Sequence, residues 1–308
     1  MTKLRIIFMG TPEFAVSSLQ KLVENDCNVV AVITAPDKPA GRGLQLSPSP
    51  VKQYAVSHGI PVLQPEKLKN PDFLEELRSY QADLQVVVAF RMLPEVVWNM
   101  PSKGTFNLHA SLLPQYRGAA PINWAIMNGE TQTGVTTFFL EHEIDTGKII
   151  YQETEPIRYE DNVGTLYERL MHIGADLVVK TVRAVEAGQY PQTPQPHDEV
   201  LKMAPKIFKE TCEINWNQPT ESVRNFIRGL SPYPAAWTVL NGKSCKIYKG
   251  TVATQFPADT ESLVATDNKH YLLFKTSDGW FSVEELQLEG KKRMGIEEFL
   301  RGTKITAS

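Results

Sequence analysis

Cysteine is scarce in this sequence, and the three residues that occur are far apart in the chain. Cys27, Cys212 and Cys245 form no CxxC pair, which excludes the spacing of a zinc knuckle or a redox-active dithiol. An odd number of isolated thiols is typical of proteins from a reducing compartment, so we expect a cytoplasmic protein.

Long apolar runs and a strong charge of one sign are also absent. No stretch approaches the roughly 18 apolar residues of a transmembrane helix, and the apolar segment 4–9 is too short for a signal peptide. The net charge of −3 gives no whole-chain signature of a nucleic-acid binder. We therefore expect no membrane association, and any contact with nucleic acid has to come from local basic surfaces.

The composition that is present is that of a globular protein, with 42% apolar and 22% charged residues. A length of 308 residues exceeds the usual size of one compact domain and favours two domains. Residues 191–196 read Pro-Gln-Thr-Pro-Gln-Pro, which cannot continue a helix and indicates an extended connector. We predict a first domain over 1–189, a linker over 190–205 and a second domain over 206–308.

Strand and helix signals alternate along the first half of the chain. Helical patterns follow Pro12 and cover 71–80 and 162–187, the last with an apolar stripe at three- and four-residue intervals. The strand candidates are short apolar runs at 4–9, 28–34, 84–90, 105–108, 135–140 and 148–151. This alternation predicts an α/β fold, a largely parallel sheet covered by helices on both faces.

The second half has a different pattern of short strands and turn signals. One helix is expected at 220–229 and another at 296–301. Strands are expected at 236–240, 245–249, 263–266, 271–275 and 280–288, and the first two flank the strong hairpin dipeptide Asn241-Gly242. The pattern predicts a small β-barrel.

Open parallel sheets bind ligands at the carboxyl ends of their strands, and three segments lie at or near such ends. The first, Gly10-Thr-Pro-Glu13, lacks the GxGxxG glycines of a dinucleotide site, so a tight turn is the simpler interpretation and an oxidoreductase is disfavoured. The second contains Asn107 and His109, which alternate in a strand and share a face. An amide and an imidazolium can together stabilise an oxyanion, although a structural histidine is an equal alternative.

The third segment, 141–147, ends in Asp145-Thr-Gly. An aspartic protease needs two such sequences and only one exists. The usual role of this aspartate is to cap its own turn. Near His109, however, its carboxylate would favour the charged imidazole. His142 and Glu143 have no partner at metal-site spacing, so we predict no metal.

These segments together resemble the folate-dependent formyltransferase family. The resemblance rests on the Asn-x-His pair, on Ser-Leu-Leu-Pro-x-Tyr-Arg-Gly at 111–118, and on an aspartate 36 positions after the histidine. It extends over nearly the whole chain through further matching segments, namely 8–16, 36–43, 64–68, 228–234 and 290–302.

The resemblance implies a Rossmann-like formyltransferase domain followed by an OB-like barrel that helps to bind tRNA. It implies that Asn107, His109 and Asp145 are catalytic and that 10-formyltetrahydrofolate is the co-substrate. The implied folate-binding residues come from two stretches: Phe90, Arg91, Met92, Leu93, Ser111, Leu112, Leu113 and Pro114. Arg91 departs from the family pattern, which has a small residue there, so the role of its side chain is open.

Within the family the match is to members that formylate initiator methionyl-tRNA, and a monomer is expected. Phe14 would contact the methionine side chain, and Lys38 and Arg42 would read the tRNA from the loop at 36–43, for which a surface loop with incidental charge is the alternative. Further implied tRNA contacts, for each of which a solvated face is the alternative, are Lys206, Lys209, Arg224, Arg228, Lys291, Lys292 and Arg293. The remaining rivals are another 10-formyltetrahydrofolate-dependent formyltransferase or hydrolase, and a silent binding module.

Overall fold

The computed structural model describes residues 3–40, 45–196, 200–254 and 262–305. Contacts divide the chain into two compact units, each assembled from separate stretches. Unit 1 comprises 1–118, 133–155 and 167–202, and unit 2 comprises 119–132, 156–166 and 203–308. Each unit has its own sheet and is described by itself.

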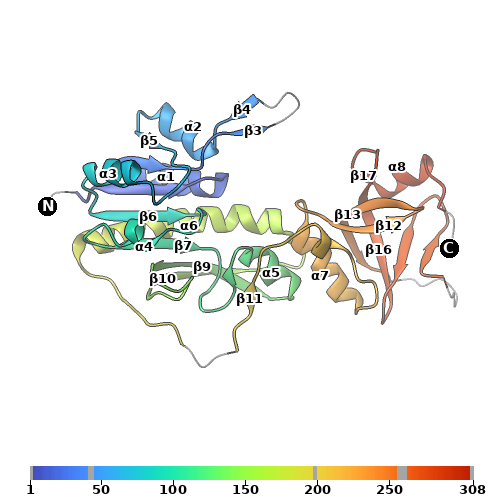
Figure 1. The fold of residues 1–308 in the computed structure, drawn as a ribbon. Coiled ribbons are helices and arrows are strands. Elements are labelled where there is room, and N and C mark those ends of the chain that lie inside the picture. Colours follow the sequence, from blue (N-terminus) through green and yellow to red (C-terminus); the bar gives the residue numbers. More distant parts are fainter. Residues whose placement is uncertain (1–2, 41–44, 197–199, 255–261, 306–308) are drawn as a thin grey trace. The chain divides into compact units, whose positions relative to one another are not determined.

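Unit 1 is built on a seven-stranded sheet in the order β10-β9-β7-β6-β1-β2-β5 (Figure 1). Its strands are β1 (Ile6–Gly10), β2 (Val29–Ile33), β5 (Val62–Leu63), β6 (Leu84–Val88), β7 (Thr105–His109), β9 (Gln132–Phe139) and β10 (Ile149–Pro156). The five strands from β7 to β5 pair in parallel, and β9 adds to β7 antiparallel. The predicted α/β fold with a largely parallel sheet is confirmed.

Helices bury both faces of this sheet. They are α1 (Glu13–Glu24), α2 (Pro50–Ser57), α3 (Pro71–Ser79), α4 (Glu95–Trp98) and α6 (Val163–Ala187). Ile7 and Met9 pack in one apolar cluster with Phe73 and Val97 of α3 and α4. Leu108 of β7 faces the other way, where its methyl group closely approaches Gly174 of α6. Alternate residues of each strand therefore pack against the helices on opposite faces of the sheet.

A short hairpin, β3 (Lys38–Ala40) with β4 (Gln45–Ser47), projects between β2 and α2. Its base is held by Asp37, whose carboxylate accepts hydrogen bonds from Lys52 Nζ at 2.6 Å and Gln64 Nε2 at 2.8 Å. These bonds favour the charged form and lower the pKa of Asp37. Arg42 lies outside the described residues.

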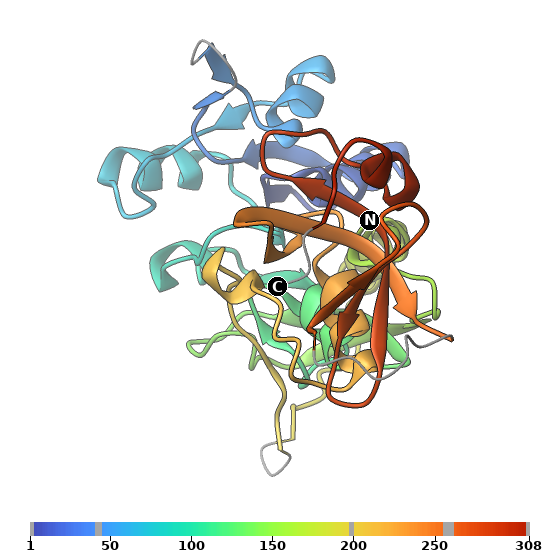
Figure 2. The same cartoon turned by 90° about the vertical axis from the view of Figure 1, so that its right-hand side faces the viewer.

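Unit 2 contains a curled antiparallel sheet, drawn in orange to red in Figure 2. It has six strands, in the order β12-β13-β16-β15-β14 with β17 on β16. Its strands are β12 (Ala236–Leu240), β13 (Lys243–Val252), β14 (Val264–Thr266), β15 (Leu272–Lys275), β16 (Trp280–Leu288) and β17 (Met294–Gly295). Asn241 and Gly242 join β12 to β13 with φ of +50° and +71°, as the predicted two-residue turn requires. The predicted OB-like barrel is confirmed as this antiparallel half-barrel.

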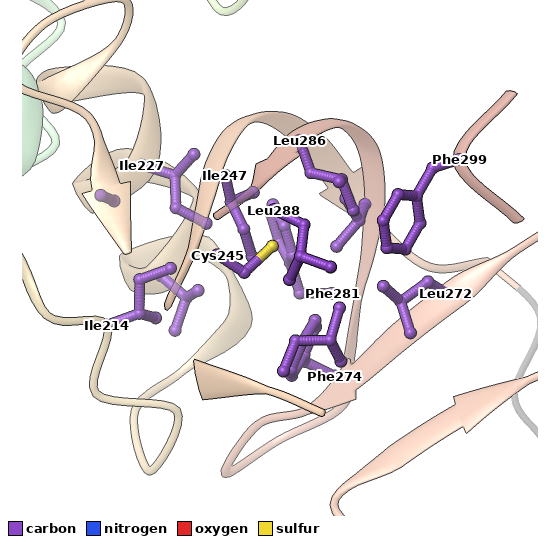
Figure 3. Close-up of a cluster of buried hydrophobic side chains, with 14 of the residues drawn as sticks. Ile214, Ile227, Cys245, Ile247, Leu272, Phe274, Phe281, Leu286, Leu288 and Phe299 are labelled. Atoms are coloured by element: carbon purple, nitrogen blue, oxygen red, sulfur yellow. The ribbon is translucent and has the colours of Figure 1, made fainter. Parts of the chain in front are cut away.

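The core of unit 2 lies between the curled sheet and two helices, α7 (Thr220–Leu230) and α8 (Ile296–Arg301) (Figure 3). Phe281 and Phe299 are at most 1% exposed, and the Trp216 ring stacks on Phe274 at 4.2 Å. The remaining short elements, most of them without a clear sequence signal, are α5 (Pro121–Met127), η1 (Glu210–Cys212), β8 (Arg117–Gly118) and β11 (Met203–Ala204). Within the described part of the chain, no helix is long and apolar enough to cross a membrane.

Cys245 belongs to this core and gives a test of it. Burial raises the pKa of its thiol to about 12, so the unreactive neutral thiol prevails at pH 8. We expect Cys245 to resist a thiol reagent in the folded protein and Cys27, which is partly exposed, to react first. All three should react in denaturant. Equal rates for Cys27 and Cys245 in the native protein would contradict this packing.

Candidate active site

Asn107 and His109 lie on one face of β7, an interior strand between β6 and β9. Asn107 pairs with Val87 of β6 and with Phe138 of β9, so its side chain lies over the middle of the sheet. His109 ends the strand and is 6% exposed. No residue that the structure describes forms a hydrogen bond with the Asn107 side chain, which leaves its amide free for a ligand.

The position of the His109 ring is set by a backbone carbonyl. Nε2 lies 2.8 Å from the oxygen of Tyr116, and since a carbonyl only accepts, Nε2 must carry the proton of this hydrogen bond. Tyr116 has φ of +61°, a left-handed conformation that is costly for a bulky residue. Nδ1 is therefore the ring nitrogen that this hydrogen bond leaves free to face the site.

Asp145 is the residue that Nδ1 faces. Its Oδ2 lies 3.9 Å from His109 Nδ1 and accepts a hydrogen bond from the backbone N–H of Gly118 at 3.0 Å. The structure thus brings together two predicted catalytic residues that are 36 positions apart. The carboxylate can stabilise positive charge on the imidazole without being bonded to it.

The loop that carries Asp145 returns along the sheet from the end of β9. Because β9 is antiparallel to β7, its last residue Phe139 pairs with Phe106, three residues before His109. Gly147 then passes so close to Phe139 that an added Cβ would lie 1.7 Å from its carbonyl oxygen. Asp145 has φ of +58°, which an aspartate tolerates better than most residues. The segment contains a turn at 144–145, and the Asp145 carboxylate binds Gly118 of another loop.

The predicted folate-binding stretch 90–93 follows β6 as irregular chain. Its backbone groups take part in none of the backbone hydrogen bonds between described residues, so they are free to meet the donors and acceptors of a flat heterocycle. The Arg91 side chain turns away, donating to the carbonyl oxygens of Pro65 and Glu66 and lying 5.7 Å from the Phe90 ring centroid. It ties down the neighbouring loop 64–68.

The second predicted folate-binding stretch, 111–114, is held in place by hydrogen bonds from side chains. Ser111 is fully buried, and its hydroxyl donates to the Gln115 carbonyl at 2.6 Å. Thr136 donates to the Ser111 carbonyl, and Gln152 donates to the Leu113 carbonyl at 2.9 Å. The Ser111 hydroxyl is thereby engaged in structure, and a contact with folate would come from the backbone and from Leu112.

Phe14 is 4% exposed at the start of α1. Its ring packs edge-on against Tyr167 at 5.1 Å, and the Tyr167 hydroxyl accepts its backbone N–H at 2.9 Å. This hydroxyl satisfies one of the free donors at the helix N-terminus. Its contact with a methionine side chain stays a prediction.

Several basic residues proposed for tRNA already have partners within unit 2. Arg224 is 6% exposed, stacks on Tyr159 at 3.4 Å and donates to the carbonyl of the same residue. Arg228 donates to the carbonyl oxygens of Arg158 and Asp161, and burial lowers its pKa. Both arginines thereby secure α7 to the 156–162 segment, and their contact with tRNA stays a prediction.

The basic run at 291–293 is paired with acidic or polar groups. Arg293 binds both oxygens of Glu285 at 2.7 Å, Lys292 lies 3.0 Å from Glu298, and Lys291 donates to the carbonyl of Gly302 at 3.3 Å. Exposed ion pairs of this kind contribute little to stability, so the contact of these residues with tRNA stays a prediction. Lys38 is exposed at the base of the hairpin.

A concavity of about 490 Å³ on unit 2 was not expected from the sequence. It is lined by three lysines and three aromatic residues, namely Lys206, Lys209, Lys246, Phe208, Tyr233 and Trp237. The Tyr233 and Phe208 side chains are 82% and 54% exposed. Lysines and open aromatic faces are the groups that meet phosphates and unpaired bases. Among the described residues, no group of three His, Cys, Asp or Glu could hold a metal ion.

The sequence is similar to that of proteins from one family. Models of the formyl transferase family and of its C-terminal domain match residues 3–182 and 206–304. The methionyl-tRNA formyltransferase of Bacteroides fragilis is 57% identical over 98% of this chain and 96% of its own length. That of Parabacteroides distasonis is 59% identical over 99% and 97%.

Solved structures share the fold at lower identity. WlaRD, a sugar 3N-formyl transferase, has a TM-score of 0.67 at 20% identity over 95% of this chain and 100% of its own. HypX from Aquifex aeolicus, solved with tetrahydrofolic acid, has a TM-score of 0.66 at 21% identity over 99% of this chain and 49% of its own. With the family models and the close relatives, these findings establish that the chain belongs to the formyl transferase family.

Proposed function

We propose that this chain transfers the formyl group of 10-formyltetrahydrofolate to the α-amino group of initiator methionyl-tRNA. The observation that carries the proposal is the His109–Asp145 pair beside the free Asn107 amide, in a chain whose close relatives bear that activity in their names. A formyl carbon placed above Asn107 and Nδ1 of His109 would have hydrogen-bond donors on its oxygen and a proton acceptor within reach.

The amine attacks the formyl carbon, and negative charge develops on the formyl oxygen as the new C–N bond forms. The Asn107 amide and the protonated Nδ1 of His109 donate hydrogen bonds to that oxygen. Asp145 balances the imidazolium charge and relays the proton lost by the amine to N10 as the C–N10 bond breaks. Nε2 keeps its proton on the Tyr116 carbonyl throughout, so the ring stays in one orientation.

The tRNA would be held by the lysine-lined concavity of unit 2, by Lys291 and Lys292, and by Lys38 and Arg42 of the segment 36–43. Lys206 lies 5.4 Å from the Phe208 ring centroid, so charge and aromatic surface are presented together. Such surfaces bind the phosphate backbone through charge and unpaired bases by stacking. We further propose a monomer in the cytoplasm, in keeping with three free thiols.

One assay tests the function directly. The protein is given 10-formyltetrahydrofolate with charged initiator tRNA, with charged elongator methionyl-tRNA, or with water alone, and formyl transfer is followed. We expect transfer to the initiator only. Turnover with water alone would instead identify a hydrolase, and transfer to neither tRNA would contradict the proposed acceptor.

If Asn107, His109 and Asp145 have these roles, substitution of any one of them should lower turnover. Asn107→Ala, His109→Ala and Asp145→Asn should each lower kcat by about 10²–10³, because one stabilising group at the oxyanion or the imidazolium is lost. Asp145→Asn keeps the side-chain size and suits the left-handed backbone, so folding should be intact by thermal unfolding. A variant with near-normal kcat and a native melting curve would remove its residue from the mechanism.

The lysines of the concavity predict a selective loss of tRNA binding. Lys206→Ala, Lys209→Ala and Lys246→Ala should each raise KM for charged tRNA and leave KM for the folate unchanged. Each phosphate contact removed should also reduce the slope of log affinity against log salt by about 1. Lys103→Ala, an exposed lysine at the amino edge of the unit 1 sheet, is the control. Equal effects of Lys103 and Lys246 would contradict a specific surface.

A further inference from the structure

The proline-rich segment predicted to be a linker is built into unit 1. Thr193 and Ile149 exchange two backbone hydrogen bonds of 2.8 and 2.9 Å, which adds one bridge to β10. Gln195 follows, between Pro194 and Pro196, and is only 2% exposed. The two flanking prolines restrict the backbone dihedral angles around Gln195, which limits the directions in which its side chain can point.

Four hydrogen bonds fix the Gln195 amide. Nε2 donates to the carbonyl oxygens of Asp145 at 2.9 Å and Gly147 at 2.8 Å. Oε1 accepts from Arg117 Nε at 3.2 Å and Nη2 at 2.6 Å. Carbonyls only accept and a guanidinium only donates, so the amide cannot be flipped without losing all four bonds.

These bonds join the two loops that flank His109. Three successive residues of one loop contact the three parts of the site: the Tyr116 carbonyl binds His109, the Arg117 guanidinium binds Gln195, and the Gly118 N–H binds the Asp145 carboxylate. Gln195 binds the other loop at the backbone of Asp145, opposite its carboxylate. Hydrogen bonds therefore fix both the backbone carbonyl and the side-chain carboxylate of Asp145.

We propose that Gln195 is a positioning residue that holds the Asp145 carboxylate beside Nδ1 of His109. The two bonds to the carbonyl oxygens of Asp145 and Gly147 fix the backbone of this loop on both sides of Thr146, and the direction of the Asp145 side chain follows from that backbone. Gln195 itself does not touch the reacting atoms. The inference rests on the proposed role of Asp145 in formyl transfer.

The test compares three variants in the full-length protein. Gln195→Met removes all four hydrogen bonds. Gln195→Glu keeps the acceptors for Arg117 and the side-chain size but removes the two donors to Asp145 and Gly147. Gln85→Met removes another buried amide, 1% exposed, which accepts from Thr105 at the amino edge of the sheet, and serves as the control.

Both Gln195 variants should lower kcat by about 10- to 100-fold, the usual effect of losing a group that orients a catalytic residue. KM for folate and for tRNA should stay within about twofold, since no binding group moves. Gln85→Met should lower the melting temperature and leave kcat unchanged. In the Asp145→Asn background, Gln195→Glu should cause no further loss of kcat, because both changes act through one carboxylate.

Three results would overturn the proposal: wild-type kcat in folded Gln195→Glu, additive losses in the double variant, or an equal fall of kcat in Gln85→Met. Should Gln195→Met fail to fold, Gln195→Glu still decides the matter. If the wild type formylates an amine other than methionyl-tRNA, the proposed function fails. The comparison of Gln195→Glu, Asp145→Asn and the double variant can then be repeated with that amine, and it still tests the role of Gln195.

Discussion

The hydrogen bond from His109 Nε2 to the Tyr116 carbonyl is the constraint around which the site is arranged. It directs Nδ1 toward Asp145, and it demands a left-handed backbone at Tyr116. Tyr116 in turn donates its N–H to the carbonyl of Lys202 at 2.6 Å. The orientation of Nδ1 of His109 thus depends on Tyr116, whose own backbone is held by Lys202, a residue outside the sheet.

The support for this arrangement is mostly polar and buried. Gln195, Thr136 and Gln152 hold the loops after β7 and β9 by donating hydrogen bonds to main-chain carbonyl oxygens. A carbonyl oxygen that is shielded from water and left without a donor would lower the stability of the fold. Apolar packing cannot set a loop at this accuracy because it has no direction, whereas hydrogen bonds do. The sheet places Asn107 and His109, and the polar bonds place Asp145.

Sequence periodicity predicted most of the regular structure, because long amphipathic or alternating segments such as α6 and β16 carry their own signal. It also placed Asn107 and His109 on one face. Asp145 entered only through resemblance, since its approach to His109 depends on a loop that turns back from β9. Gln195 was missed because its partners Arg117 and Asp145 are 78 and 50 positions away. No local pattern encodes such contacts.

The segment that carries the buried Gln195 side chain changes what counts as the smallest catalytic fragment. A chain cut at residue 189 would retain the whole seven-stranded sheet together with Asn107, His109 and Asp145. It would lose Gln195 and the carbonyl of Lys202, and with them the bonds that orient Asp145 and Tyr116. An insertion or deletion between 193 and 195 would shift Gln195 relative to Arg117 and Asp145. The length of chain between the Thr193 bridge and Gln195 is therefore restricted, because both residues are bonded to unit 1.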